Sequence, residues 1–187
     1  MKTLIVYGTR YGATSGTSEE VASVLRGEGF KVRVVNAKEE RIEGVSEFEL
    51  VIVGGGLQMG RWPSETEDFL KKFQKELTQK KVAVFVSSAM KALLEHEGKG
   101  EELEKTRQMF LEDKPAKYGL KPISVAFFGG IIDFNKMGFL ARKAFGSMKG
   151  RFEVAGFKEN RPGVYDTRNW DEIRVWARKL VLKARYL

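Results

Sequence analysis

The sequence predicts one α/β domain over residues 1–187, with a parallel five-stranded sheet covered by helices on both faces. Five short apolar runs alternate with longer amphipathic segments along the chain, and this order is typical of strand–helix–strand units with right-handed crossovers. No linker rich in Pro, Gly or Ser and no internal repeat divides the chain, and its length fits a single domain.

Each predicted strand is a run of β-branched and apolar residues. Strands that are buried on both faces read as nearly unbroken apolar runs, and residues 2–7, 50–53, 82–86 and 123–128 meet this description. Residues 31–35 alternate between charged and apolar side chains, which indicates a strand at the edge of the sheet.

Helices are predicted where apolar residues recur at spacings of three and four. The segments with this pattern are residues 19–26, 64–77, 101–111 and 170–187. Residues 8–18 are therefore expected to form a loop between the first strand and the first helix.

An insertion is predicted at about residues 131–168, because about forty residues separate the fifth strand from the last helix, where a handful would suffice. Within it, residues 136–148 have helical periodicity, and the apolar face comprises Met137, Leu140, Ala141, Ala144, Phe145 and Met148. Between Asp133 and Glu153 there are basic residues but no acidic one. Such a segment is typical of a helix that lies on an anionic membrane surface or docks on a partner, so peripheral membrane association through residues 134–152 is one hypothesis. A helix that covers the edge of the sheet with solvated lysines is the alternative.

Composition excludes several classes of function. The chain has no cysteine and a single histidine, His96, which lies in an acidic stretch that we expect to be exposed. Thiolate nucleophiles, cysteine-ligated clusters and multi-histidine metal sites are thereby excluded. Neither a catalytic residue nor a metal ligand is predicted, so any redox chemistry would have to be carried by a bound organic cofactor.

Charge and hydropathy point to the expected surroundings. The 33 Lys and Arg outnumber the 25 Asp and Glu, which gives a net charge of +8 and favours anionic partners. No apolar run approaches the roughly 20 residues that a membrane-spanning helix needs, and the amino-terminal residues read as a strand, so we expect a cytoplasmic protein. No recognised nucleic-acid motif is present, and no nucleic-acid partner is expected.

The loop at residues 8–18 is the predicted anion-binding site. Ligands of open parallel sheets bind beyond the carboxyl ends of the strands, and this loop is rich in Gly, Thr and Ser with one charge, on Arg10. Its backbone N–H groups and hydroxyls, with the amino terminus of the next helix, can bind a phosphate dianion. Thr17, with Glu20 three residues later, can also serve as a simple helix cap.

Several motifs resemble a known family. Thr9, Gly12 and Thr14, directly after the first strand, resemble the FMN-phosphate signature of flavodoxins. Within that superfamily the chain is most similar to the branch of menaquinone-dependent protoporphyrinogen IX oxidases, through residues 9–14, 51–62, 125–130 and 166–170. The resemblance implies a flavodoxin-like three-layer sandwich with strand order 2-1-3-4-5, and FMN as the cofactor.

The resemblance also implies which residues bind the cofactor. They are Thr9, Arg10, Tyr11, Gly12, Ala13, Thr14 and Thr17 in the first loop, Gly56, Leu57, Gln58, Met59, Gly60 and Trp62 after the third strand, Ser87, Ser88, Ala89 and Met90 after the fourth, and Gly129 and Gly130 after the fifth. Met59, Trp62 and Met90 are candidates to pack on the flavin ring, with ordinary core packing as the alternative for each. Because the first loop is about four residues longer than the family pattern, Thr14 and Thr17 both stay open as the last phosphate contact.

The implied function is that of an FMN-binding redox protein that transfers electrons through a non-covalent flavin. A redox partner protein or a quinone would exchange electrons with it. Two alternatives are a protoporphyrinogen IX dehydrogenase with a quinone acceptor and, in another class, a non-redox module that binds an anion or a nucleic acid on the same fold.

Overall fold

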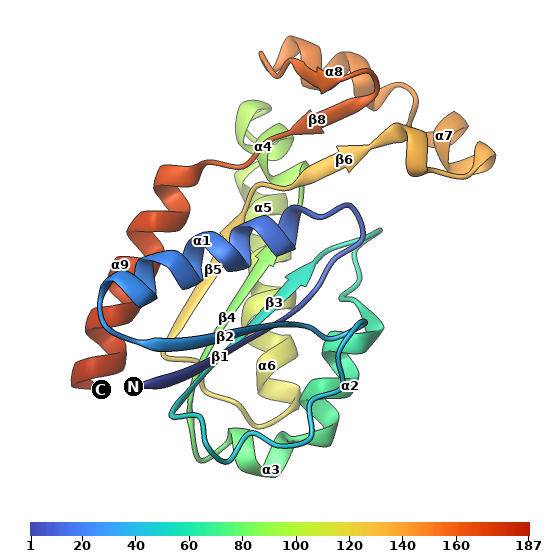
Figure 1. Cartoon of the computed structure of the whole chain (residues 1–187). Helices are drawn as coiled ribbons and strands as arrows, with labels where there is room; N and C mark the ends of the chain where they lie inside the picture. Colours follow the sequence, from blue (N-terminus) through green and yellow to red (C-terminus); the bar gives the residue numbers. More distant parts are fainter.

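The computed structural model describes residues 1–187, apart from the side chains of Ala141 and Ala144. Its centre is a parallel sheet with the order β2-β1-β3-β4-β5 (Figure 1), which confirms the predicted fold and strand order. The strands are β1 (Lys2–Gly8), β2 (Lys31–Asn36), β3 (Leu50–Gly56), β4 (Lys81–Ser87) and β5 (Ser124–Phe128). Because β2 stands at the end of this strand order, beside β1, the prediction of an edge strand at residues 31–35 is confirmed.

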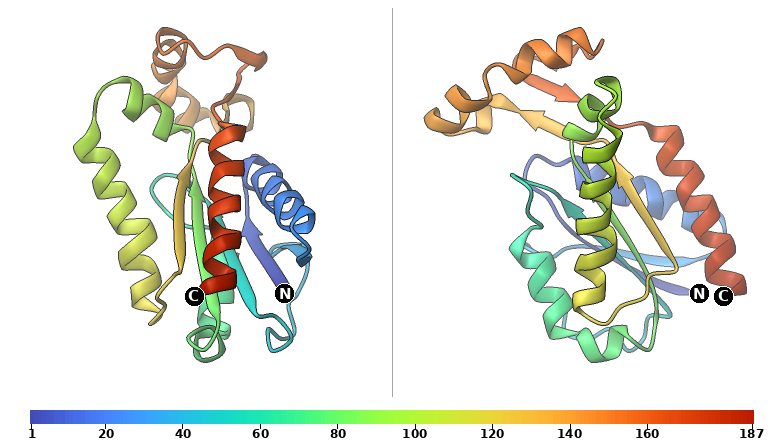
Figure 2. Two further views of the ribbon diagram at one scale, coloured as in Figure 1. Left: turned by 90° about the vertical axis from the view of Figure 1, so that its left-hand side faces the viewer. Right: turned by 180° about the vertical axis from the view of Figure 1, so that it is seen from behind.

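Two helical layers bury the two faces of the sheet, as Figure 2 shows from two sides. One layer consists of α1 (Ala13–Gly27) and α9 (Trp170–Tyr186). The other consists of α2 (Ser64–Lys72), α3 (Gln74–Leu77), α5 (Gly100–Arg107), a π-helix at Gln108–Asp113 and α6 (Lys114–Lys117). The short α4 (Met90–His96) follows β4, and His96 is exposed, as expected.

The central strands are mostly apolar because most of their side chains pack against one of these layers. In β1, Leu4 and Val6 pack in the core on the α2 side, whereas Ile5 packs in the core on the α1 side. Three rings stiffen the α9 side: Phe85, Phe128 and Trp176 have centroids 5.6–6.0 Å apart. Such aromatic pairs contribute roughly 0.5–1.5 kcal/mol each beyond the area that they bury.

Some of the predicted helix boundaries are wrong. Helix α1 begins at Ala13, six residues before the predicted start at residue 19, so residues 16–18 are helical and Thr17 is no cap. Its N-cap is Gly12, with a left-handed φ of 88°. The predicted helix at 64–77 is interrupted at Phe73, and the one at 101–111 passes into the π-helix.

The insertion lies beyond the carboxyl ends of the strands (orange in Figures 1 and 2) and has a small core of its own. It contains β6 (Ile131–Asp133), a 3-10 turn at Phe134–Lys136, α7 (Phe139–Phe145), α8 (Met148–Val154), β7 (Glu159–Arg161) and β8 (Val164–Asp166). Its strands form an antiparallel sheet with the order β6-β8-β7.

The predicted single helix at 136–148 is wrong. Gly138 is the extended N-cap of α7, and Gly146 and Ser147 separate α7 from α8. The predicted apolar face is divided accordingly: Met148 is buried, whereas Leu140 is 79% exposed. The predicted burial of Ala141 and Ala144 lies outside the described side chains. Within the described part of the chain, no helix is long and apolar enough to cross a membrane.

Candidate functional site

A cavity of about 460 Å³ opens at the carboxyl ends of β1, β3, β4 and β5, beneath the insertion. Its volume is in the range of small-molecule sites, which have roughly 300–1,000 Å³. Most of the predicted cofactor residues line it, namely Thr9, Arg10, Tyr11, Ala13, Thr14, Gly56, Leu57, Gln58, Met59, Gly60, Ser87, Ser88, Ala89, Met90 and Gly130. The structure therefore brings together four loops that are far apart in the sequence.

One end of the cavity is formed by the turn between β1 and α1. Gly12 donates its N–H to Thr9 Oγ1 at 3.1 Å, and among the described residues no side chain caps the amino terminus of α1 or places a carboxylate in its first turn. The N–H groups and the partial positive charge of an uncapped helix terminus favour an anion. This turn has the features of a phosphate-binding site.

Thr14 is the most constrained hydroxyl at this end. Its side chain is fully buried, and Thr14 Oγ1 lies 3.0 Å from Ser87 Oγ. A Cβ at Gly56 would come within 2.7 Å of the same Thr14 oxygen, so the end of β3 has no room for a side chain there. The hydroxyl thus lies at the junction of the turn after β1, the end of β3 and the end of β4.

A tight hairpin after β3 forms one wall. Gln58 and Arg61 exchange two backbone hydrogen bonds of 3.0 Å, and the two residues between them have positive φ, 46° at Met59 and 68° at Gly60. These angles are those of a type I′ turn, in which methionine is disfavoured by roughly 1–2 kcal/mol. Leu57 donates its N–H to the carbonyl of Ser87 at 2.9 Å, which joins this wall to β4. The Met59 side chain, 76% exposed, lies at the mouth of the cavity.

Four predicted residues do not line the cavity. Gly12 is the adjoining N-cap, and Thr17 is buried within α1. Trp62, 4% exposed, packs in the core on the α2 side and lines an adjoining hollow that shares Thr9, Gly56, Gln58 and Met59 with this cavity. Gly129 has a packing role, because a Cβ there would collide with the backbone carbonyl of Thr167.

Sequence reasoning missed several residues of the lining, most of them apolar. The missed residues are Leu94, Thr106, Phe110, Phe127, Met137, Gly138, Phe145 and Met148, and the lining also includes Ile131 and Ile132, directly after the predicted Gly129 and Gly130. The lining residues from Ile131 to Met148 belong to the insertion, which therefore covers the cavity as a roof. The apolar periodicity of residues 136–148 placed Met137, Phe145 and Met148 on one apolar face. It did not show that this face covers the cavity.

Charged contacts attach the roof to the rest of the chain and also join two parts of the roof. Arg151 donates from Nε and Nη2 to the two carboxylate oxygens of Glu97 at 2.6 and 2.7 Å. These bonds, with Lys99 nearby, lower the pKa of Glu97 to about 2. Lys149 contacts Glu159 at 2.7 Å across the insertion, and this hydrogen bond lowers the pKa of the Glu159 carboxyl.

The cavity offers few groups for acid–base chemistry. Arg10 and Tyr11 are the ionisable side chains among the described lining residues. In the described part of the chain, no group of three His, Cys, Asp or Glu residues is arranged to hold a metal ion. The site is suited to binding and orienting a ligand that brings its own reactivity.

The strand order, the anion-binding turn after β1 and a cavity at the same edge define the class of doubly wound α/β proteins that bind a nucleotide-like cofactor where the strand order reverses. A family model described as a flavodoxin domain matches residues 4–151. The chain belongs to the flavodoxin family, whose members are redox proteins, and this membership supports a flavin cofactor.

Solved structures agree on the fold. A short-chain flavodoxin associated with a bacterial microcompartment has a TM-score of 0.59 and 16% identity, covering 98% of this chain and 99% of that one. A flavodoxin from the domain Archaea has a TM-score of 0.53 and 14% identity over the full length of both chains. Flavodoxin 1 from Bacillus cereus has a TM-score of 0.51 and 16% identity, over 82% of this chain and 98% of its own.

One curated relative is similar in sequence over a shorter stretch of the chain. Protoporphyrinogen IX dehydrogenase [quinone] from Escherichia coli (strain K12) is 31% identical over 72 residues, which cover 38% of this chain and 40% of that protein. The match thus spans about two fifths of the length of this relative.

Proposed function

We propose that the chain binds FMN non-covalently in the cavity and transfers electrons through it. The observation that carries this proposal is that the uncapped turn before α1 opens into the same cavity as the 57–60 hairpin and the 87–90 segment. The phosphate would be bound by residues 9–14, and the ring would lie between the hairpin, the 87–90 segment and the roof. When bound, FMN supplies the capacity to accept and donate one or two electrons, and the protein supplies binding, orientation and exclusion of water.

Within this proposal, Thr14 rather than Thr17 makes the last phosphate contact. Thr14 lines the cavity, and its hydroxyl can accept a hydrogen bond from Ser87 while it donates to a phosphate oxygen. Thr17 lies one turn further along α1, outside the lining.

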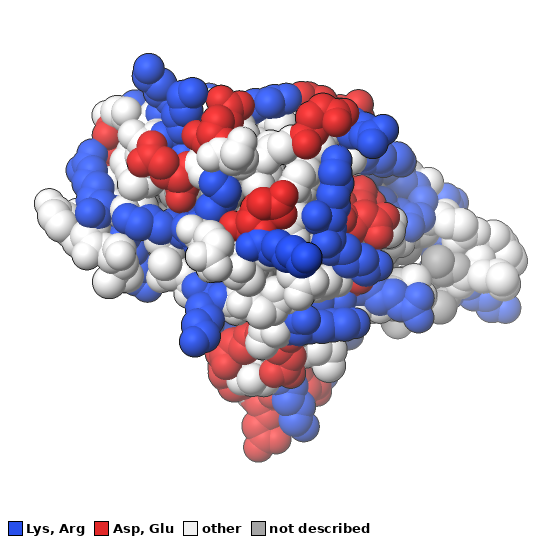
Figure 3. All heavy atoms as spheres, turned by 90° about the horizontal axis from the view of Figure 1, so that it is seen from below, with Lys and Arg blue, Asp and Glu red and all other residues white. Residues whose placement is uncertain are grey.

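Flavin titration tests the proposal. Purified protein should show flavin absorption and release FMN on heating, and stripped protein should quench the fluorescence of added FMN with a 1:1 end point. Colourless protein that does not bind added FMN would refute the proposal and would favour the non-redox alternative. On the face shown in Figure 3, Lys and Arg are interspersed with Asp and Glu. This face therefore has no continuous basic surface that would favour the non-redox alternative.

A redox partner protein or a quinone would exchange electrons with the flavin. The apolar roof, formed by Met137, Phe145 and Met148, favours a small apolar acceptor, and the curated relative is named for a quinone. Oxidation of protoporphyrinogen IX with a quinone acceptor is therefore the second candidate activity. Flavin-loaded protein that shows no turnover in an anaerobic assay with both substrates would be assigned as an electron carrier.

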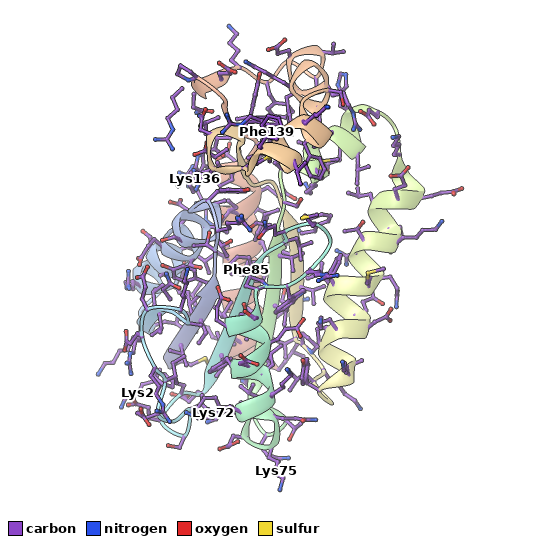
Figure 4. The ribbon with its side chains drawn as sticks, turned by 90° about the vertical axis from the view of Figure 1, so that its right-hand side faces the viewer. Lys2, Lys72, Lys75, Phe85, Lys136 and Phe139 are labelled. Carbon is purple, nitrogen blue, oxygen red and sulfur yellow. The ribbon has the colours of Figure 1, made fainter. Side chains whose placement is uncertain are left out.

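We further propose that the protein is cytoplasmic and associates peripherally with anionic membranes through residues 134–152. Phe139 and Leu140, at the start of α7, are 80% and 79% exposed, and the exposed Lys136 and Lys143 flank them. Figure 4 shows Lys136 and Phe139 in the insertion, at the opposite end of the molecule from Lys2. Exposed apolar side chains beside cations are suited to the boundary between headgroups and acyl chains.

Vesicle co-sedimentation tests this association. The protein should pellet with vesicles that contain phosphatidylglycerol at low salt, and the double substitution Phe139→Ser, Leu140→Ser should weaken binding by at least about tenfold, because it removes two apolar side chains from the lipid. Val154→Ser is the matched control: Val154 is 79% exposed in the same insertion, but it follows the acidic Glu153. Wild-type protein that stays in the supernatant with anionic vesicles would contradict the proposal.

A further inference from the structure

Two consecutive residues after β8 contact the two ends of the cavity. Thr167 is bonded to Gly130, which lines the ring end: Thr167 N donates to the Gly130 carbonyl at 2.9 Å, and Gly130 N donates to Thr167 Oγ1 at 3.1 Å. Arg168, the next residue, extends in the other direction and donates from Nη1 to the carbonyl of Ala13, in the first turn of α1, at 3.3 Å. The chain that returns from the insertion therefore joins the ring end to the phosphate end.

The Arg168 side chain is fixed before it reaches α1. Asp166 accepts from Arg168 Nε at 2.9 Å and from Nη2 at 2.5 Å, and the guanidinium lies over the ring of Trp170 at 4.4 Å. The side chain is only 11% exposed. A guanidinium held on two sides by planar contacts loses little further entropy when it makes one more hydrogen bond.

Gly16 in α1 supplies the space for this guanidinium. A Cβ at Gly16 would lie closer to Arg168 Nη1 than real Cβ atoms approach any neighbour, and 3.6 Å from the Trp170 ring. Glycine inside a helix costs roughly 0.5–1 kcal/mol relative to alanine. The side chain of Arg168 thus gives a physical reason for a glycine in the second turn of α1.

We propose that Arg168 is a positioning residue for the phosphate-binding turn. By fixing Ala13 and the space beside Gly16, it sets the first turn of α1 at a constant distance from Gly130, so that one ligand can reach the phosphate end and the ring end together. This proposal rests on the proposed binding of FMN. Loss of Arg168 should affect binding of the phosphate and not binding of the ring, because Thr167 fixes the ring end of the cavity.

Comparison of FMN with riboflavin, which lacks the phosphate, tests this role. Arg168→Ala and Gly16→Ala should each weaken FMN affinity roughly three- to tenfold, the effect of one lost hydrogen bond, and should leave riboflavin affinity within about twofold. The control is Arg174→Ala, because Arg174, in α9, is likewise an arginine that contacts α1, through Glu20 at 2.5 Å, but further from the turn. This control should bind both flavins as the wild type does.

Thermal unfolding without flavin tests the contact itself. Gly16→Ala should lower Tm in the wild-type background, where the methyl group displaces the guanidinium. It should raise Tm in the Arg168→Ala background, where the space is free and alanine is the better helix former. The same sign in both backgrounds would show that the guanidinium does not occupy this space, and it would overturn the proposal.

The flavin outcomes separate the two proposals. Wild-type protein that binds neither flavin overturns the proposed function and the role of Arg168 with it. Wild-type protein that binds FMN, while the Arg168 and Gly16 variants bind it equally tightly, overturns the role of Arg168 alone. Equal losses for FMN and riboflavin would indicate general destabilisation in place of positioning.

Discussion

Replacing Thr14 with valine removes one hydroxyl from the junction of three loops and keeps the shape of the side chain nearly unchanged. In the flavin-free protein, Thr14 Oγ1 and Ser87 Oγ are hydrogen-bond partners at 3.0 Å, and both side chains are at most 2% exposed. Thr14→Val leaves the buried Ser87 hydroxyl without this partner, which should lower the free energy of unfolding by about 1–3 kcal/mol. Adding Ser87→Ala should recover most of that loss, because both polar atoms are then absent.

The effect on FMN affinity should be larger than the effect on riboflavin affinity. A hydrogen bond to a charged group is worth about 1.5–3 kcal/mol, which corresponds to roughly ten- to hundredfold weaker FMN binding at 25 °C. Riboflavin offers no phosphate to this hydroxyl, so its affinity should change little.

Fluorescence titration with the two flavins, combined with urea unfolding of the flavin-free protein, measures both effects. Thr17→Val is the matched control, because Thr17 is equally buried in α1 and its hydroxyl has no hydrogen-bond partner among the described residues. If Thr14→Val binds FMN as the wild type does while Thr17→Val binds it weakly, the phosphate is not at Thr14 and our reasoning about the turn is wrong.

Three further predictions concern the walls and the roof. Met59→Asn should raise the free energy of unfolding by about 0.5–1 kcal/mol in urea titrations, since asparagine tolerates the left-handed φ of 46°; no gain would mean that the turn is not strained. Trp62→Phe should leave FMN affinity within about twofold, because Trp62 is 4% exposed and packs in the core on the α2 side, outside the cavity beneath the roof; a large loss would place the flavin in the adjoining hollow that Trp62 lines. The pKa of Glu97 is depressed to about 2 by Arg151, so the stability that this pair contributes is present above about pH 4.5 and is lost as pH falls toward 2. Glu97→Gln should therefore flatten the acid side of the Tm profile, and parallel profiles for variant and wild type would contradict this.

The sheet was predictable because its signal is local. Apart from Lys2 in β1 and Gly56 in β3, every residue of these two strands is buried, so the strands read as nearly unbroken apolar runs that can be recognised without knowing their partners. The turn after β1 was predictable for a similar reason, since hydroxyls and glycines at residues 9–14 have few other uses at the end of a buried strand.

The start of α1 was not predictable from local pattern. Gly16, Thr17 and Ser18 are poor helix formers and show no apolar stripe. Tertiary packing overrides that preference: Thr17 and Ser18 are fully buried, and Gly16 accommodates Arg168, which is distant in sequence. Only knowledge of that long-range contact would have extended the helix back to Ala13.

The roof of the cavity depends on contacts that no short segment encodes. Strands β6, β7 and β8 have three residues each, too few for an alternating pattern to be visible. Phe110 reaches the cavity from a π-helix, a distortion without a recognised sequence signature. These elements are defined by pairing with each other and by the space above the sheet.

The insertion leaves and re-enters the sheet at a single point, because Ile131 is paired with Asp166 and Gly130 with Thr167. A shorter protein in which residue 130 is joined directly to residue 167 would therefore need no rearrangement of the five strands. Evolution can add or remove such a segment in one step, and with it the cover above the ligand. The insertion thus controls how far solvent and other molecules can reach a bound redox centre. This access can change while the five strands and their binding loops stay the same.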